Sequence, residues 1–126
     1  MPHREYIAVV DDDESIREAL PDLIGVFGHR ALTFPSAEAF LASDRIDQTK
    51  CLVLDIAMPG MSGVDLQCEL IRLGRGIPIV FITAHGDEEF CQHLRRTGSV
   101  ECLLKPFTDT ALLDALNAVL QPGAPA

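Results

Sequence analysis

The sequence has no hydrophobic run long enough to cross a membrane, and its first residues, Met1-Pro-His-Arg-Glu5, lack the apolar segment of a secretion signal. Basic residues are also scarce: 10 Lys and Arg stand against 19 Asp and Glu, for a net charge of −9. Because proteins grip a nucleic-acid backbone with a basic face, this charge argues against DNA or RNA binding by the domain itself. We expect a cytoplasmic domain with no membrane partner.

Paired cysteine motifs are missing as well. The four cysteines show no spacing typical of a zinc site or a disulfide framework: they are Cys51, Cys68, Cys91 and Cys102. Two fall in predicted strands and two in predicted helices. We expect all four to be small buried hydrophobic residues in a reducing compartment.

Hydrophobic residues make up 48% of the 126 positions, which is enough for one domain with an ordinary core and too many for a disordered chain. Short apolar runs alternate with helical patterns, as in the β-α-β units of a parallel sheet. The predicted strands are residues 6–10, 30–34, 51–54, 79–82 and 102–104. The predicted helices are residues 16–27, 36–41, 62–73, about 88–97 and 108–120, with N-caps at Ser36, Ser62 and Thr108. Residues 1–120 should form the domain, and residues 121–126 a linker or tail.

Five polar residues stand where a predicted strand stops: Asp11, Asp12, Asp55, Thr83 and Lys105. In a parallel α/β sheet the ligand site lies just beyond the carboxyl ends of the strands, so these side chains should converge on one rim. Three carboxylates at such close range repel each other. The rim therefore needs a divalent cation, which in turn would attract a phosphoryl group.

The acidic run at Asp11 continues through Asp13 and Glu14, but these two stand where a helix begins, so capping and the helix dipole explain them. A calcium loop counted from Asp11 fails, because Ile16 occupies the position that needs glycine and Asp22 that of the bidentate glutamate.

Asp55 follows a buried strand and precedes a turn rich in Pro and Gly, which presents its carboxylate on a tight loop. Such a carboxylate beside Mg²⁺ can act as a nucleophile, as in aspartyl-phosphate chemistry. On the next strand end, Ala84 follows Thr83, and its small side chain would leave its N–H open to an incoming oxygen. The Lys105–Pro106 bond is a candidate for a cis peptide in a tight turn.

Four motifs together resemble a response-regulator receiver domain of two-component signalling: Val9-Val-Asp-Asp-Asp-Glu-Ser15, Leu54-Asp-Ile-Ala-Met-Pro-Gly-Met-Ser-Gly63, Ile82-Thr-Ala-His-Gly-Asp87 and Leu104-Lys-Pro-Phe107. The triple Asp followed by Glu-Ser, together with Ser36-Ala-Glu-Ala-Phe-Leu41, resembles the FixJ-type subgroup. The resemblance covers about residues 6 to 120. It implies a flavodoxin-like, doubly wound parallel sheet of five strands in the order 2-1-3-4-5, with five helices.

The resemblance also implies a function. Asp55 would accept a phosphoryl group from a sensor histidine kinase. Mg²⁺ would be bound by Asp11, Asp12, Asp55 and the backbone carbonyl of Ala57. The phosphoryl group would be contacted by Thr83, Ala84, Ala57 and Lys105. Such a domain is a switch rather than an enzyme, with at most self-phosphorylation from small donors and autodephosphorylation. The FixJ-type resemblance implies a DNA-binding helix-turn-helix output domain outside this chain, and it is compatible with a phosphorylation-dependent homodimer.

Two positions depart from the family pattern. Ala57 stands where related domains often carry a polar or charged side chain that influences hydrolysis. Cys102 stands where the family commonly places an aromatic residue, which swings inward on activation as Thr83 moves. We therefore expect Thr83 and Cys102 to be the switch positions, with a weaker response at Cys102.

A haloacid-dehalogenase-like phosphatase is the alternative. Asp11-Asp-Asp13-Glu-Ser15 also fits the Asp-x-Asp-x-Thr/Ser opening of that family, and Asp11 would then be the nucleophile of a true hydrolase. The family needs another acidic metal-binding motif after its Lys, but only Asp109 and Asp114 follow Lys105. This alternative also leaves the sequence around Asp55 unexplained. A third reading, a receiver-like domain that binds partners without phosphorylation, is disfavoured by the complete acidic set.

Overall fold

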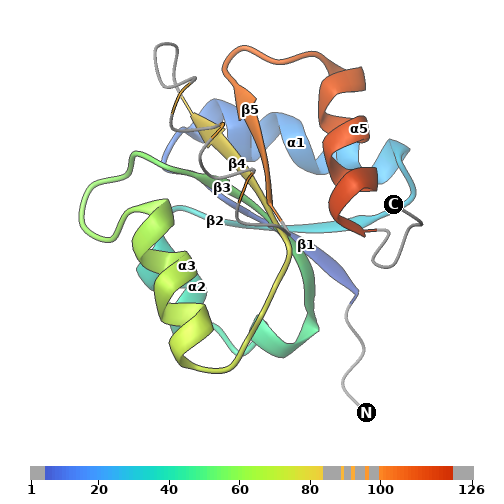
Figure 1. The fold of residues 1–126 in the computed structure, drawn as a ribbon. Helices are drawn as coiled ribbons and strands as arrows, with labels where there is room; N and C mark the ends of the chain where they lie inside the picture. The colour runs from blue at the N-terminus through green and yellow to red at the C-terminus, as the bar shows by residue number, and fades with distance from the viewer. Residues whose placement is uncertain (1–4, 84–88, 90–91, 93–95, 97–99, 121–126) are drawn as a thin grey trace.

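A computed structural model describes residues 5–83, 89, 92, 96 and 100–120 of the chain. Its centre is a sheet of five parallel strands in the order β2-β1-β3-β4-β5 (Figure 1). The strands are β1 (Tyr6–Val10), β2 (Arg30–Phe34), β3 (Thr49–Asp55), β4 (Ile79–Thr83) and β5 (Val100–Leu104). The strand order confirms the predicted flavodoxin-like fold.

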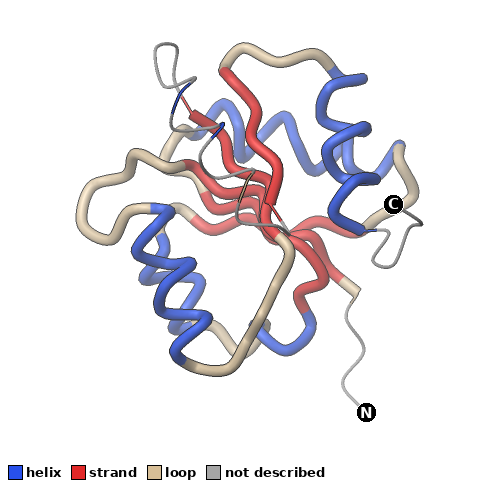
Figure 2. Tube along the Cα trace, viewed as in Figure 1, coloured by secondary structure: helices blue, strands red, loops and turns tan. Residues whose placement is uncertain are grey.

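The helices cover both faces of this sheet (Figure 2). They are α1 (Glu14–Val26), α2 (Ala37–Ala42), α3 (Gly63–Arg72) and α5 (Asp109–Leu120), with a 3₁₀ turn at Ile46–Gln48. The helices α1 and α5 lie on one face, and α2 and α3 on the other. The helix predicted at about residues 88–97 falls largely outside the described residues. Within the part of the chain that is described, no helix has the length and apolar character needed to span a bilayer.

Burial of the central strands on both faces explains their unbroken apolar runs. Successive side chains of a strand point to opposite faces. In β1, Ile7 and Val9 accordingly join the cluster under α1 and α5, whereas Ala8 and Val10 join the cluster under α2 and α3. All four are fully buried. The sheet therefore has two hydrophobic cores, and the strand ends are held between them.

The predicted helix caps all form. In each, a side-chain oxygen accepts a backbone N–H of the first turn; the capping residues are Asp13, Ser36, Ser62 and Thr108. At α3, the Ser62 hydroxyl accepts the N–H of Asp65, and the Asp65 carboxylate accepts the N–H of Ser62, both at 3.1 Å. These caps fix the starts of the helices that follow the carboxyl ends of the strands.

The cysteines differ from the prediction. Cys51 is buried as expected, and it is a free thiol. Cys68 is free but exposed, because it lies two residues from buried Leu66 and therefore on the opposite side of α3. Cys102 is buried and disulfide-bonded, which corrects its assignment as a reduced thiol. Cys91 lies outside the described residues.

Candidate functional site

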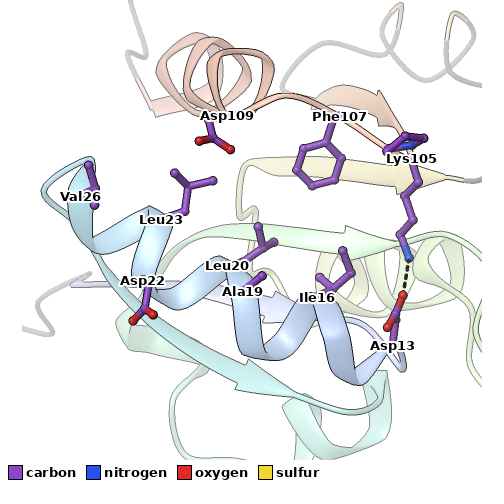
Figure 3. A pocket seen from close by; sticks show the side chains of 11 residues that line it. Asp13, Ile16, Ala19, Leu20, Asp22, Leu23, Val26, Lys105, Phe107 and Asp109 are labelled. Atoms are coloured by element: carbon purple, nitrogen blue, oxygen red, sulfur yellow. Dashed lines mark ion pairs between the residues drawn. The ribbon is translucent and has the colours of Figure 1, made fainter.

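A cavity of about 760 Å³ opens beside the carboxyl end of the sheet, between α1 and the segment that joins β5 to α5 (Figure 3). Its walls are mainly apolar and include Ile16, Leu20, Leu23 and Phe107. One end is formed by Asp13 and Lys105, whose Oδ2 and Nζ atoms are 4.0 Å apart. No sequence pattern predicts this cavity, because the periodicity of α1 predicts only that one face of the helix is apolar.

Beyond that end lies the predicted group of carboxylates. Asp55 is the last residue of β3, and Asp11 and Asp12 follow β1 directly. One oxygen of each lies within 4.8 Å of an oxygen of the other two. We call Asp11, Asp12 and Asp55 the acidic cluster. It forms where the parallel strands β1 and β3 end side by side.

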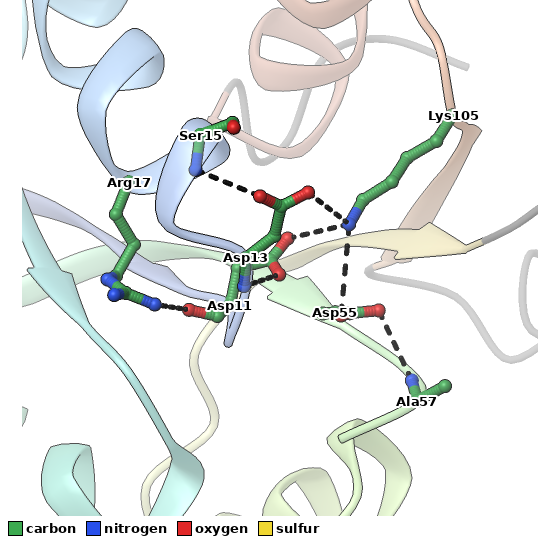
Figure 4. A network of polar contacts seen from close by, with 7 residues as sticks. All are labelled: Asp11, Asp13, Ser15, Arg17, Asp55, Ala57 and Lys105. Carbon is green, nitrogen blue, oxygen red and sulfur yellow. Dashed lines mark hydrogen bonds and ion pairs between the residues drawn. The ribbon is translucent and has the colours of Figure 1, made fainter. Parts of the chain in front are cut away.

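Lys105 supplies positive charge to this cluster (Figure 4). Its Nζ lies 3.1 Å from Oδ2 of Asp11, 3.9 Å from Oδ2 of Asp55 and 4.0 Å from Oδ2 of Asp13. One ammonium group is thus shared by three carboxylates, so it compensates their charge only in part.

The carboxylate of Asp11 is fully buried. Its Oδ1 accepts the N–H of Asp13 at 2.9 Å, and its backbone carbonyl accepts a hydrogen bond of 2.9 Å from Nη1 of Arg17. Among the described residues, its Oδ2 has no hydrogen-bond partner, since the nearby ammonium of Lys105 forms an ion pair without hydrogen-bond geometry. A buried oxygen without a hydrogen bond, beside two more carboxylates, fits a hard divalent cation such as Mg²⁺.

Asp55 is 6% exposed. Burial, reinforced by the charge of Asp11, raises the pKa of the Asp55 carboxyl to about 7. Lys105 and the N–H of Ala57, which donates to Oδ1 of Asp55 at 3.2 Å, act in the opposite direction but do not cancel this rise. A cation in the acidic cluster would favour the charged form of Asp55.

The turn after Asp55 packs closely against the start of α3. The N–H of Gly63 donates to the carbonyl of Ile56 at 2.9 Å. A Cβ atom at Gly63 would lie 2.4 Å from the carbonyl oxygen of Asp55, closer than real Cβ contacts allow. Glycine is therefore required here by the approach of α3 to the end of β3.

The sequence and the fold are similar to those of known proteins. Residues 7–117 match the family described as "Response regulator receiver domain". The chain belongs to this family. It is 45% identical to nodulation protein W of Bradyrhizobium diazoefficiens over 118 residues, which cover 94% of this chain and 52% of that protein. The chain spans about half the length of the curated relatives it matches.

Solved structures agree with the family assignment. The response regulator StyR is 48% identical, with a TM-score of 0.82 over 93% of this chain and 59% of that one. FixJ-N is 33% identical, with a TM-score of 0.81 over 97% of this chain and 98% of that one. The predicted resemblance to receiver domains is confirmed, and FixJ is among the relatives. The phosphatase alternative finds no support in these matches.

The other residues predicted for the site belong to β4, to β5 or to the residues that directly follow these strands in the sequence. Thr83 ends β4 and is buried, and its carbonyl accepts the N–H of Lys105 at 2.8 Å. The Lys105–Pro106 peptide bond is cis, as predicted. Cys102 is away from the rim, in the hydrophobic cluster under α2 and α3. Ala84 lies outside the described residues.

Two residues of the rim were not predicted from the sequence. Arg17 holds the carbonyl of Asp11, and Glu38 of α2 accepts the backbone N–H of Met61 at 3.1 Å. Arg17 could have been found from its position in the first turns of a helix that begins beside the acidic run. Glu38 gives no such signal, because 23 positions separate it from its partner.

Proposed function

We propose that this receiver domain accepts a phosphoryl group on Asp55 and acts as a switch rather than as a turnover enzyme. A carboxylate oxygen of Asp55 would attack the phosphorus of a phosphohistidine on a sensor histidine kinase. The P–N bond breaks, an acyl phosphate forms, and the imidazole leaves with the electron pair and takes up a proton. The observation that supports this proposal is the position of Asp55 at the end of β3, with Lys105 3.9 Å away.

Accessibility favours Asp55 over Asp11 as the nucleophile. Asp11 is fully buried, and its Oδ1 already accepts the N–H of Asp13. Asp55 is 6% exposed, so it is the more accessible of these two carboxylates to a donor. This difference also argues against the phosphatase reading, in which Asp11 would have to attack.

Mg²⁺ is the cofactor that suits these oxygen ligands, and Asp11, Asp12, Asp55 and the carbonyl of Ala57 would hold it. When bound, it would neutralise charge on the carboxylates and on the phosphoryl oxygens. Lys105 would exchange part of its contact with Asp55 for a phosphoryl oxygen. Thr83 and the backbone N–H of Ala84 would contact that group and report its arrival at the end of β4.

The output of the whole protein is also a proposal. The relatives named as transcriptional regulators are longer than this chain, whose matched residues cover 57% and 54% of them, and they support a DNA-binding helix-turn-helix domain beyond residues 121–126. The complete protein would work in the cytoplasm with its histidine kinase, and phosphorylation would control a homodimer. The coding sequence after Ala126 tests this organisation, because an immediate stop codon would contradict it.

Labelling with a small donor tests the assignment of Asp55. The domain is incubated with Mg²⁺ and acetyl phosphate, and the residue that gains the mass of one phosphoryl group is located by peptide mass spectrometry. We expect label on Asp55 alone and none in Asp55→Asn. Asp44→Asn is the matched control, because the side chain of Asp44 is 97% exposed and lies outside the acidic cluster. Label on Asp11, or rapid hydrolysis of added phosphate esters, would instead support the phosphatase.

A further inference from the structure

The turn that follows Asp55 is held by a side chain from a different helix. Oε2 of Glu38, in the first turn of α2, accepts the backbone N–H of Met61 at 3.1 Å. We infer that Glu38 is a positioning residue, whose carboxylate fixes this turn so that the carbonyl of Ala57 and the carboxylate of Asp55 keep the geometry needed for the cation and the phosphoryl group. This inference rests on the function proposed above.

The carboxylate of Glu38 lies directly against the backbone of the turn. Gly60 has a φ angle of +76°, a conformation that side chains rarely adopt, and a Cβ atom there would lie 2.7 Å from Oε2 of Glu38. Glycine is therefore favoured at position 60 for two reasons. It permits the turn, and it leaves the space that the Glu38 carboxylate occupies.

Glu38 belongs to α2, and the hydrophobic core holds this helix in place. Its neighbours Ala37 and Phe40 are fully buried, and the ring of Phe40 packs edge-on against Phe34 with 5.3 Å between centroids. The hydroxyl of Ser36 caps the helix by accepting the N–H of Ala39 at 3.0 Å. Glu38 is thus presented from a fixed support, as an effective positioning residue requires.

The two ends of the turn are anchored by backbone hydrogen bonds. Ile56 donates to the carbonyl of Ile82, and Gly63 donates to the carbonyl of Ile56, both at 2.9 Å. Between these anchors, Met58 is buried and Met61 packs at the margin of the same cluster. These apolar contacts hold side chains, whereas the carboxylate of Glu38 fixes the backbone at Met61. Its loss should loosen the segment that carries Ala57.

The test compares Glu38→Ala with Glu38→Gln, which keeps a side-chain oxygen as acceptor. Binding of Mg²⁺ alone is measured by calorimetry, and phosphorylation is measured as the initial rate with acetyl phosphate. We expect Glu38→Ala to bind Mg²⁺ roughly two- to tenfold more weakly, the range for the loss of one ordinary hydrogen bond, and to be labelled correspondingly more slowly. Glu38→Gln should recover most of both losses. Glu69→Ala, which removes a carboxylate paired with Arg72 on α3, should retain wild-type values.

Gly60→Ala provides a second measurement. It should also weaken Mg²⁺ binding, because the new Cβ meets Oε2 of Glu38 in addition to the unfavourable φ. In the Glu38→Ala background the clash between the new Cβ and Oε2 of Glu38 is absent. The double variant should therefore bind Mg²⁺ more tightly than the product of the two single effects predicts. Strict multiplication of the two effects would overturn the inference.

The outcomes separate this inference from the proposed function. If the wild type is labelled at Asp55 while Glu38→Ala binds Mg²⁺ and is labelled as the wild type is, Glu38 has no positioning role. Glu38→Gln as impaired as Glu38→Ala would also overturn the inference. If the wild type is not labelled but Glu38→Ala still weakens Mg²⁺ binding, the proposed phosphoryl transfer fails and the positioning of the cation site stands.

Discussion

Gly63→Ala is the substitution whose effect the structure determines most directly. The added Cβ would lie 2.4 Å from the carbonyl oxygen of Asp55 and 3.0 Å from the Cα atom of Ile56, whereas ordinary contacts begin at 3.4 Å. The start of α3 and the end of β3 must therefore move apart by about 1 Å, the difference between 3.4 and 2.4 Å. Both neighbours are backbone atoms, so rotation of a side chain cannot relieve the clash.

Two costs follow from this displacement. Overpacking typically destabilises by ~1–3 kcal/mol. Weakening the 2.9 Å hydrogen bond between Gly63 and Ile56 adds about 1 kcal/mol. We expect a loss of roughly 2–4 kcal/mol in the free energy of unfolding. For a chain of 126 residues the entropy of unfolding is roughly 0.26 kcal/mol per degree, so the melting temperature should fall by roughly 8–15 °C.

Thermal and urea unfolding of Gly63→Ala and Gly25→Ala give a matched comparison. Gly25 lies in α1, and a Cβ there meets no atom within 4 Å, so alanine should stabilise the helix by about 0.5–1 kcal/mol. The two substitutions are chemically identical but should change stability in opposite directions. Wild-type stability in Gly63→Ala would refute the argument, as would equal losses in both variants.

Two further predictions concern the acidic cluster. Mg²⁺ at ~100 times its dissociation constant should stabilise the domain by roughly 2.7 kcal/mol, and Asp12→Asn should remove most of this gain; an unchanged wild-type melting midpoint on adding Mg²⁺ would contradict the prediction. Without Mg²⁺, the free energy of unfolding should fall as pH rises from about 4 towards 7. The pKa of Asp55 is about 7 in the folded state, against 3.8 for a free side chain. In this pH window the folded state therefore holds a proton that the unfolded state has lost, and raising the pH favours unfolding. Urea unfolding at pH 5 and pH 8 measures this fall, which Asp55→Asn should reduce; equal pH dependence in both proteins would show that another group is responsible.

Strands were the most predictable part of the fold. β1 and β2 have the predicted limits. In β1 the reason is clear, because its short apolar run ends at Asp11. β3 begins at Thr49, two residues earlier than predicted, so it also includes Thr49 and Lys50. Thr49 is a buried polar residue whose hydroxyl donates to the carbonyl of Arg45 at 2.8 Å. Hydrophobic periodicity cannot reveal a polar strand residue that is satisfied in this way.

The acidic cluster and Lys105 could be predicted because their positions depend on the backbone alone. Once the strands are parallel, residues at their carboxyl ends must meet. Glu38 could not be predicted, because its role depends on the angle at which a short helix packs and on the path of a turn. Asp13 shows the intermediate case: its capping role was predicted from the start of α1, but its 4.0 Å contact with Lys105 was not.

Lys105 connects the parts of this site that lie far apart in the sequence. Its ammonium is shared among carboxylates that follow β1 and end β3, and its backbone N–H is bonded to the last residue of β4. The same side chain forms one end of the cavity beside α1. A change of charge on Asp55 alters the balance of forces on this one ammonium group. Lys105 is therefore the residue through which the acidic cluster is connected both to the end of β4 and to the cavity wall.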